Sequence, residues 1–326
     1  MLQFPRRSIS SAIAALAIVA SAPLLAAPIC ADKAIKMVIP QPAGGVGDVV
    51  ARIIGEKAAL LLEQPMIYDN RPGASTTIGT ALAAAAKPDG CTLLHMTTTA
   101  VVASAIRDAL PYNIERDLVP VVGIGSFPLA LTVLESSKFK TVADLIAAAK
   151  AGDGLNYSTG GTGSMGHLSA LRLLRESGTK GTHVPYKGNA PALQGLLASD
   201  VHFMFPSTFE ALPLQQGGKV RVLAVTSESR LPSFAQVPTM KELGFADFAP
   251  RIWYVFLMPT ATSPQVVQRV QEAFAKALAD PAIAANLNAR GFITEVRNSA
   301  EAATFLRTES ARWKKVVQDN GIKSLD

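Results

Sequence analysis

The sequence predicts an α/β fold of two lobes, each a mainly parallel sheet flanked by helices, with two crossovers between the lobes. Short apolar runs alternate with helical patterns of about 10–15 residues, which is typical of βαβ units. This alternation occurs in two series, before about residue 128 and from about residue 155 to 226. The length of 326 residues also fits two domains, since one domain usually takes about 150 residues.

The composition excludes several classes of protein. Hydrophobic residues make up 49% of the chain and charged residues 17%, so the chain has the apolar surface that a disordered protein lacks. Two cysteines, and four histidines that never fall at i, i+4 spacing, argue against a multi-cysteine or helical metal site. The net charge of +6 comes without a long basic run. We therefore expect no metal, no cofactor and no nucleic-acid partner.

The first 31 residues have the pattern of a secretory signal peptide. Arg6 and Arg7 precede the apolar run Ala12–Ala20, and small residues follow. The apolar run is much shorter than the roughly 20 residues that a membrane span needs. Cleavage is expected after Ala26 or Ala31. The mature protein is therefore expected to be exported.

The first series of elements begins with a buried apolar strand. A helical stripe formed by Val49, Val50, Ile53 and Ile54 then indicates an amphipathic helix. The alanine-rich helix after it ends at the turn signal Lys87–Gly90. The expected strands are Ile35–Pro40, Met66–Tyr68 and Thr92–Met96, and the expected helices are Gly47–Leu62 and Ile78–Ala86.

A β-rich stretch, Val119–Val133, is interrupted at Pro128, and we expect the chain to cross to the second lobe near Phe127–Leu131. Thr141 caps a helix to Lys150, with Asp144 in its first turn, where the helix dipole favours a carboxylate. The expected strands that follow are Leu155–Ser158, Thr182–Pro185, Val201–Phe205 and Val220–Thr226. The expected helices are one ending at Glu176, Ala190–Ala198 and Thr208–Gln216.

The chain is expected to return to the first lobe near Arg251–Phe256. Beyond Pro259 the pattern predicts only helices: Pro264–Ala279, Pro281–Ala289 and Ala300–Asn320. Without strands of their own, these helices must pack on an existing sheet. The first lobe is therefore assigned to residues 32–128 and 254–326, and the second lobe to residues 129–253.

Two glycine-rich turns, Pro42–Asp48 and Thr159–Gly166, each follow an expected strand and open an expected helix. Glycines let the backbone approach a ligand closely. The helix start supplies unpaired N–H groups and the positive end of a dipole, which together favour an anion. Each turn alone is equally well explained as a tight connection. Two of them, one in each lobe, favour a ligand site between the lobes.

The second turn also partly matches the motifs of two other functions. Gly161–Gly166 matches the dinucleotide pattern G-x-G-x-x-G, but the next strand ends in Tyr186–Gly188 without the required acid. A secreted α/β hydrolase that uses Ser164 with a histidine, His167 or His183, is the alternative function. The sequence places no acid to orient either imidazole, and it lacks the first glycine of G-x-S-x-G.

Motifs spread over residues 32–323 resemble those of the Bug (TctC-like) family: Ile39-Pro40-Gln41-Pro42-Ala43-Gly44-Gly45 with Asp48 and Arg52, Asn70-Arg71-Pro72-Gly73, Pro88-Asp89-Gly90, Gly163-Ser164 with His167, and His183-Val184-Pro185-Tyr186-Lys187-Gly188. The resemblance implies a periplasmic solute-binding protein with a type II-like Venus flytrap fold. Such a protein is not an enzyme and is expected to be a monomer. It closes over a small organic carboxylate and passes it to the membrane permease subunits of a tripartite tricarboxylate transporter.

The resemblance also implies the ligand-binding residues. From the first lobe they are Gln41, Ala43, Gly44, Gly45, Val46, Asp48, Ser75, Thr76 and Thr97. From the second lobe they are Thr159, Gly161, Gly163, Ser164, His167, Pro206 and Ser207.

The chain departs from the family pattern at several of these positions. Ser75 and Thr76 stand where the family often has two glycines, and Pro206 stands where many members carry Asp. Without that carboxylate, a ligand amine has no evident partner, which puts amino-acid ligands in doubt. Arg251 near the returning crossover is either a ligand contact or a surface arginine.

The two cysteines are expected to form a disulfide if both remain in the mature chain. Cys30 lies five residues before the first expected strand, and Cys91 immediately precedes the third. The first and third strands of a doubly wound sheet are neighbours, so both sulfurs fall at the edge opposite the ligand site. An exported protein meets oxidising conditions. Alternatively, cleavage after Ala31 removes Cys30 and leaves Cys91 as a small buried residue.

Overall fold

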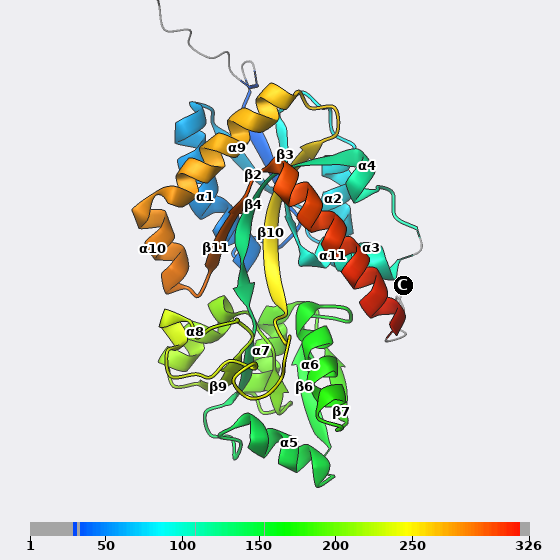
Figure 1. Cartoon of the computed structure of the whole chain (residues 1–326), viewed down its shortest axis with the longest axis vertical. Coiled ribbons are helices and arrows are strands. Elements are labelled where there is room, and N and C mark those ends of the chain that lie inside the picture. Colours follow the sequence, from blue (N-terminus) through cyan, green and yellow to red (C-terminus); the bar gives the residue numbers. More distant parts are fainter. Residues whose placement is uncertain (1–28, 31–32, 108, 153, 320–326) are drawn as a thin grey trace, which may run out of the picture.

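The computed structural model describes residues 29–30, 33–107, 109–152 and 154–319. The expected signal peptide lies outside the described residues, apart from positions 29 and 30. Two lobes, each a sheet with helices on both faces, are stacked along the long axis of the molecule (Figure 1). Within the described part of the chain, no helix has both the length and the apolar character needed to cross a membrane.

The first lobe is built on a six-stranded sheet in the order β11-β4-β10-β3-β1-β2. Its strands are β1 (Ile35–Ile39), β2 (Met66–Asn70), β3 (Thr92–Thr97), β4 (Leu118–Pro128), β10 (Arg251–Pro259) and β11 (Ile293–Arg297). One face is covered by α1 (Val46–Leu62), α9 (Pro264–Ala279) and α10 (Pro281–Ala289). The other face is covered by α2 (Thr77–Ala84), α3 (Thr98–Ile106) and α11 (Ser299–Asp319). The short η1 (Ala74–Thr76) precedes α2, and α4 (Ile114–Asp117) precedes β4.

The second lobe is built on a five-stranded sheet in the order β7-β6-β8-β5-β9. Its strands are β5 (Ala130–Leu134), β6 (Leu155–Thr159), β7 (Gly181–Pro185), β8 (Phe203–Met204) and β9 (Val220–Val225). Its helices are α5 (Val142–Lys150), α6 (Met165–Glu176), α7 (Asn189–Leu197), α8 (Thr208–Gln216) and the short η2 (Pro232–Phe234). Thr141 caps α5 in a capping box with Asp144, as the sequence predicts.

The two-lobe α/β fold is confirmed, but two details need correction. Both sheets are mixed rather than mainly parallel: β10 runs antiparallel to β3 and β4, and β5 runs antiparallel to β8 and β9. β5 and β10 each enter a lobe from the junction and run away from it, whereas β4 and β9, with which they pair, run toward it. The C-terminal helices also do not stand alone, since β11 (Ile293–Arg297) joins the first sheet beside β4.

The two crossings between the lobes lie side by side. β4 ends at Pro128 and β5 of the other sheet begins at Ala130, so a single residue separates the sheets. The returning chain enters the first sheet at Arg251, which pairs with Pro128. The junction is therefore narrow, which suits a hinge between two rigid sheets.

The far edge of the first sheet carries the disulfide. Cys30 and Cys91 are bonded in the structure, with their Cα atoms 5.4 Å apart. β1 and β3 pair in parallel with Lys36 opposite Thr92, which brings the segments before both strands together. The bond links the segment before β1 to the turn before β3, at the end of the sheet that faces away from the second lobe.

Candidate ligand-binding site

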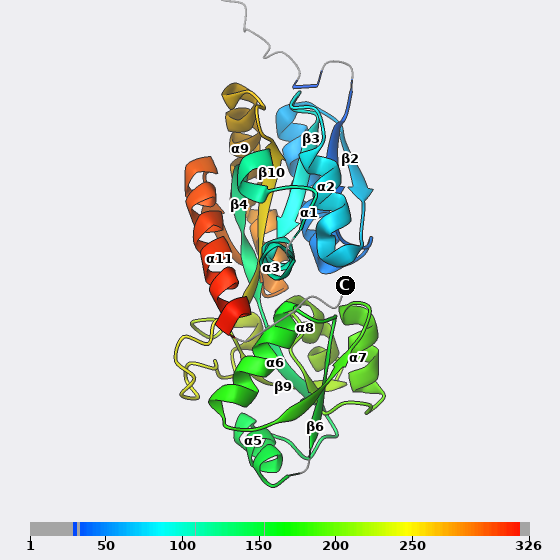
Figure 2. The same cartoon turned by 90° about the vertical axis from the view of Figure 1, so that its right-hand side faces the viewer.

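Both glycine-rich turns lie on the edges of the sheets that face the other lobe. β10 begins where the chain arrives from the second lobe and runs antiparallel to β3, so the carboxyl ends of β1 and β3 point toward that lobe. The same reasoning applies to β8, which runs antiparallel to β5 and parallel to β6. Figure 2 shows α1, α2 and α3 on one side of the junction and α6, α7 and α8 on the other. At one point the lobes touch: a Cβ on Gly163 would lie 2.7 Å from Cδ1 of Ile106 in α3.

All the predicted ligand-binding residues lie on this junction side of the sheets. They lie at the ends of the strands β1, β2, β3, β6 and β8, or in the turns and helix starts that follow these strands. In chain order they are Gln41, Ala43, Gly44, Gly45, Val46, Asp48, Ser75, Thr76, Thr97, Thr159, Gly161, Gly163, Ser164, His167, Pro206 and Ser207.

The carboxylate of Asp48 closes the first glycine-rich turn from inside. It accepts hydrogen bonds from the N–H of Gly44 at 2.9 Å, from Nε of Arg52 at 2.9 Å and from Nδ2 of Asn70 at 2.9 Å. Burial raises the pKa of Asp48, but the hydrogen bonds from Arg52, Gly44 and Asn70 outweigh burial and leave the pKa below its ordinary 3.8. The side chain is only 3% exposed. Asp48 therefore shapes the turn, and its charge is used within the first lobe.

The start of α1 is open to an anion. Its N-cap, Gly45, has no side chain to bond the first N–H groups. Within the described part of the chain, the N–H groups of Val46 and Gly47 donate to no protein acceptor. Two unpaired N–H groups at the positive end of a 17-residue helix favour an anion nearby.

The second turn is closed by an imidazole. The N–H of Gly163 donates to Nδ1 of His167 at 3.1 Å, and the N–H of His167 donates to Oγ of Ser164, the N-cap of α6. In the described residues, the N–H groups of Met165 and Gly166 find no protein acceptor. The second lobe therefore also presents an open helix start toward the junction.

The hydrolase alternative finds no support in this arrangement. A serine nucleophile needs a hydrogen bond to its base, but Oγ of Ser164 bonds the backbone of His167 rather than its ring. Nδ1 of His167 is taken by Gly163, and Nε2 of His183 lies 2.7 Å from Oγ1 of Thr159. Burial, followed by the neighbouring His183, lowers the pKa of His167 to about 4. The ring nitrogens of both imidazoles form their hydrogen bonds with residues of the turn.

Comparison with known proteins gives the family. The model described as "Tripartite tricarboxylate transporter family receptor" matches residues 50–322. The chain belongs to this receptor family. It is 33% identical over 310 residues to protein BugT of Bordetella pertussis, an alignment that covers 92% of this chain and 94% of that protein.

Solved structures of similar receptors share the fold over nearly their whole length. The periplasmic binding protein BugD has a TM-score of 0.80 at 28% identity, covering 89% of this chain and 98% of that one. Rpa4515 of R. palustris with adipate has a TM-score of 0.84 at 30% identity, covering 90% and 98%. MatC (Rpa3494) from Rhodopseudomonas palustris with bound malate has a TM-score of 0.79 at 29% identity, covering 87% and 98%.

The receptor has a carboxylate near the junction that the sequence analysis missed. Glu210 in α8 accepts three hydrogen bonds: from Oγ of Ser207 at 2.7 Å, from the N–H of Ser207 at 2.9 Å and from Nδ2 of Asn189 at 3.0 Å. Burial raises the pKa of Glu210 despite these bonds. Burial and then the charge of Glu210 raise the pKa of Tyr254 on β10. The start of α8 contacts the first lobe, because Oγ1 of Thr208 donates to the carbonyl oxygen of Gly291 at 3.2 Å. The expectation that amino-acid ligands are disfavoured, which rests on Pro206, stays a prediction.

A second missed residue is His95 on β3, which lies under the start of α1. Its ring stacks on Tyr254 with centroids 5.1 Å apart, and Cε1 lies 3.3 Å from where a Cβ on Gly47 would be. Both ring nitrogens are buried and have no hydrogen-bond partner among the described residues, and the same holds for Oε1 of Gln41. Burial lowers the pKa of His95 to about 3. His95 and Gln41 therefore place polar but uncharged groups beside the start of α1, and a lone histidine in a strand gave no sequence signal for this.

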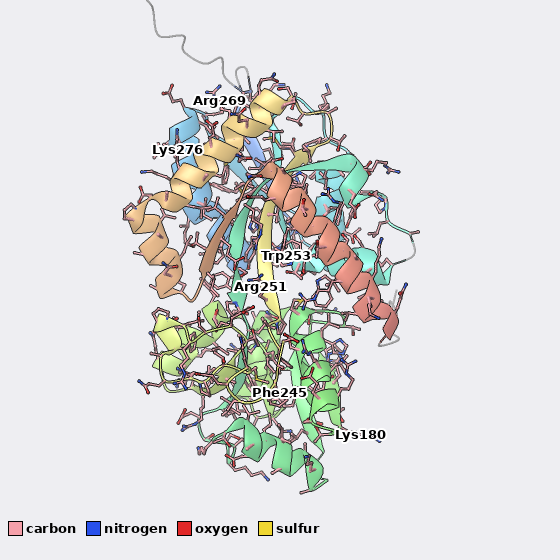
Figure 3. The ribbon with its side chains drawn as sticks, viewed as in Figure 1. Lys180, Phe245, Arg251, Trp253, Arg269 and Lys276 are labelled. Carbon is pink, nitrogen blue, oxygen red and sulfur yellow. A yellow bond between two sulfur atoms is a disulfide. The ribbon has the colours of Figure 1, made fainter. Side chains whose placement is uncertain are left out.

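Two further predicted positions have structural partners. Ala74, Ser75 and Thr76 all have positive φ, at 47°, 51° and 76°. Nη1 of Arg107 at the end of α3 holds this loop by donating to the carbonyl oxygen of Ala74 at 2.9 Å. Arg251 lies at the junction (Figure 3), where Nη1 pairs with Oε1 of Glu295 at 2.8 Å. Its charge is thus already paired, which weakens its interpretation as a ligand contact.

Proposed function

We propose that this receptor captures a small organic carboxylate between its lobes in the periplasm and delivers it to the membrane permease subunits of a tripartite tricarboxylate transporter. The observation that carries the proposal is the pair of open helix starts, at Val46 and Met165, on the two facing sheet edges. The malate bound to MatC and the adipate bound to Rpa4515 support a carboxylate ligand for this chain too.

A carboxylate held by both helix starts stabilises the closed arrangement of the lobes without an arginine clamp. Each charge-assisted hydrogen bond to a helix N–H contributes about 1.5–3 kcal/mol. The narrow junction at Pro128 and Arg251 lets the lobes open for exchange. Ligand binding and lobe closure are therefore one event in this proposal.

The test removes one N–H and leaves the helix intact. Val46→Pro places proline at the first position of α1, where its fixed φ suits the helix and the missing N–H breaks no intrahelical bond. Gly45 ahead of it is extended, at φ −70° and ψ 164°, as a residue before proline should be. The matched control is Val142→Pro, the same change at the first position of α5, whose N-cap Thr141 is also extended.

Calorimetric titration with malate and with adipate should show affinity reduced by about tenfold or more in Val46→Pro, the equivalent of one charge-assisted bond. Val142→Pro should bind like the unaltered protein. Equal affinity of both variants would show that the start of α1 does not hold the ligand. Native mass spectrometry of freshly purified protein should identify a co-purifying carboxylate, and a non-acidic occupant would overturn the ligand class.

A further inference from the structure

Two histidine rings lie against each other behind the second glycine-rich turn. His167 of α6 and His183 of β7 stack with centroids 4.0 Å apart and ring planes 19° apart. Tyr157 of β6 stacks on His183 at 5.2 Å, and Phe203 of β8 stacks on Tyr157 at 5.3 Å. The column of rings therefore joins the turn to three strands of the second sheet.

Each histidine also contacts the turn itself. Nδ1 of His167 accepts the N–H of Gly163, and an imidazole nitrogen can accept only when it carries no proton. Nε2 of His183 and Oγ1 of Thr159 share a hydrogen bond of 2.7 Å, and the same Oγ1 accepts the N–H of Gly161 at 3.2 Å. His167 therefore holds Gly163 directly, and His183 holds Gly161 through Thr159.

We propose that His167 and His183 are positioning residues: as neutral rings they hold the second glycine-rich turn in the shape that offers the N–H groups of α6 to a ligand, and protonation of His167 releases that turn. This inference rests on the proposed function, because it concerns the same binding site.

The surroundings of the two rings disfavour a positive charge. Burial and then His183 lower the pKa of His167 from 6.5 to about 4, and burial also lowers the pKa of His183. Tyr157 faces both rings from β6 and stays neutral, since burial raises its pKa to about 12. Among the described residues, no carboxylate shifts the pKa of either imidazole. A cation at His167 would therefore face another imidazole, the N–H of Gly163 and the positive end of α6.

The direction of the pH dependence follows from this depressed pKa. Above pH 6.5 the ring is neutral whether the turn is held or released, so the protonation of His167 adds no pH dependence to the affinity. As the pH falls below 6.5, only the released turn takes up a proton, and the held turn loses population by up to about tenfold per pH unit. The loss is complete once the pH has fallen through about 4, where the held turn also becomes protonated.

The first test needs no ligand. In protein with isotope-labelled glycine and histidine, magnetic resonance should find the His167 proton on Nε2, and the Gly163 amide signal should shift together with the titration of His167. His202 supplies an internal control, because its Nδ1 likewise accepts a backbone N–H, that of Asn156, on an exposed site away from the turn. A Gly163 signal that ignores the titration of His167 would overturn the proposal.

The second test compares three variants by titration with malate and adipate at several pH values. His167→Leu should lose at least about tenfold in affinity near neutral pH, whereas His202→Leu should lose none. His167→Asn, whose Oδ1 takes the place of Nδ1, should retain affinity and show only the pH dependence of the ligand's own carboxyl groups. His167→Leu binding as well as the unaltered protein, or His167→Asn keeping the unaltered pH profile, would contradict the positioning role. If neither probe binds, the malate and adipate assignment fails, while the glycine and histidine titration still decides the role of the rings.

Discussion

The glycine-rich turns of the two lobes follow the same backbone course with different side chains. Gly44 in the first and Gly163 in the second both have φ +77°, and each donates its N–H to the side chain four residues later. The residues after them, Gly45 and Ser164, cap their helices at nearly equal angles, φ −70° and −65°, ψ 164° and 158°. The acceptor is the carboxylate of Asp48 in one lobe and the imidazole of His167 in the other.

The comparison shows which features both turns share and which feature differs between the lobes. The shape requires a left-handed glycine and an acceptor four residues on, while the charge of that acceptor is free to vary. The carboxylate of Asp48 is buried beside its counter-ion Arg52, one helical turn along α1. The residue four positions after His167, which corresponds to Arg52 in the first turn, is Leu171. A neutral imidazole needs no counter-ion there. The first turn is thus held by an ion pair, and the second by a ring that proton binding would weaken.

The largest expected effect concerns the disulfide, which ties only the first lobe because the sequence has just two cysteines. Replacing both with serine should lower the free energy of unfolding by about 4 kcal/mol, from the loop-closure entropy of a 61-residue separation. Urea denaturation of the exported protein measures this. The intact mass should rise by one hydrogen per sulfur on reduction, and a mature chain that begins at Asp32 would rule the bond out.

The next effect compares the two acceptors directly. Asp48→Ala removes the acceptor of the Gly44 N–H and the counter-ion of Arg52, which should cost about 3 kcal/mol of stability. Arg52 and Asn70 each keep one other acceptor, Oδ1 of Asn70 and the carbonyl oxygen of Gln41. His167→Ala leaves the single N–H of Gly163 unpaired and should cost about 1–2 kcal/mol. Denaturant unfolding at neutral pH measures both, and equal costs would show that the ion pair adds nothing to the first turn.

The same pair of turns should respond differently to acid. The stability that Asp48 contributes is present above its unfolded pKa of 3.8 and is lost only as the pH falls through its lower folded value. The contribution of His167 declines already below pH 6.5. Amide hydrogen exchange at about pH 5 should therefore show the second turn opening before the first. The reverse order would contradict the assignment of the two acceptors.

The smallest effect concerns backbone strain in the two lobes. Ser75 beside the candidate site and Ser199 on an exposed loop of the second lobe both have positive φ, at 51° and 68°. Replacing either with glycine should stabilise the protein by about 1 kcal/mol, because glycine adopts this conformation without a Cβ penalty. Thermal unfolding measures the gain. Only Ser75→Gly should also weaken malate or adipate binding; unchanged affinity would remove Ser75 from the site.

Most elements were predictable because their signals are local. The capping box of Thr141 and Asp144 and the stripe on α1 lie within a few residues of sequence. β11 was missed because it is a half-exposed edge strand with little apolar alternation. Its pairing also depends on Gly125, where a Cβ would collide with the carbonyl oxygen of Ile293, a contact between distant segments.

The sequence by itself determined the two βα series, the glycine-rich turns and the positions at which a carboxylate is expected to bind, because turns, caps and periodicity involve neighbouring residues. Only the tertiary structure decided which groups serve those turns. It placed His183 against Thr159, 24 residues away in sequence. It also set Glu210 beside Asn189 and the buried His95 beneath Gly47. Such partners are brought together by strand order and helix packing, and their burial then sets which of them carries a charge.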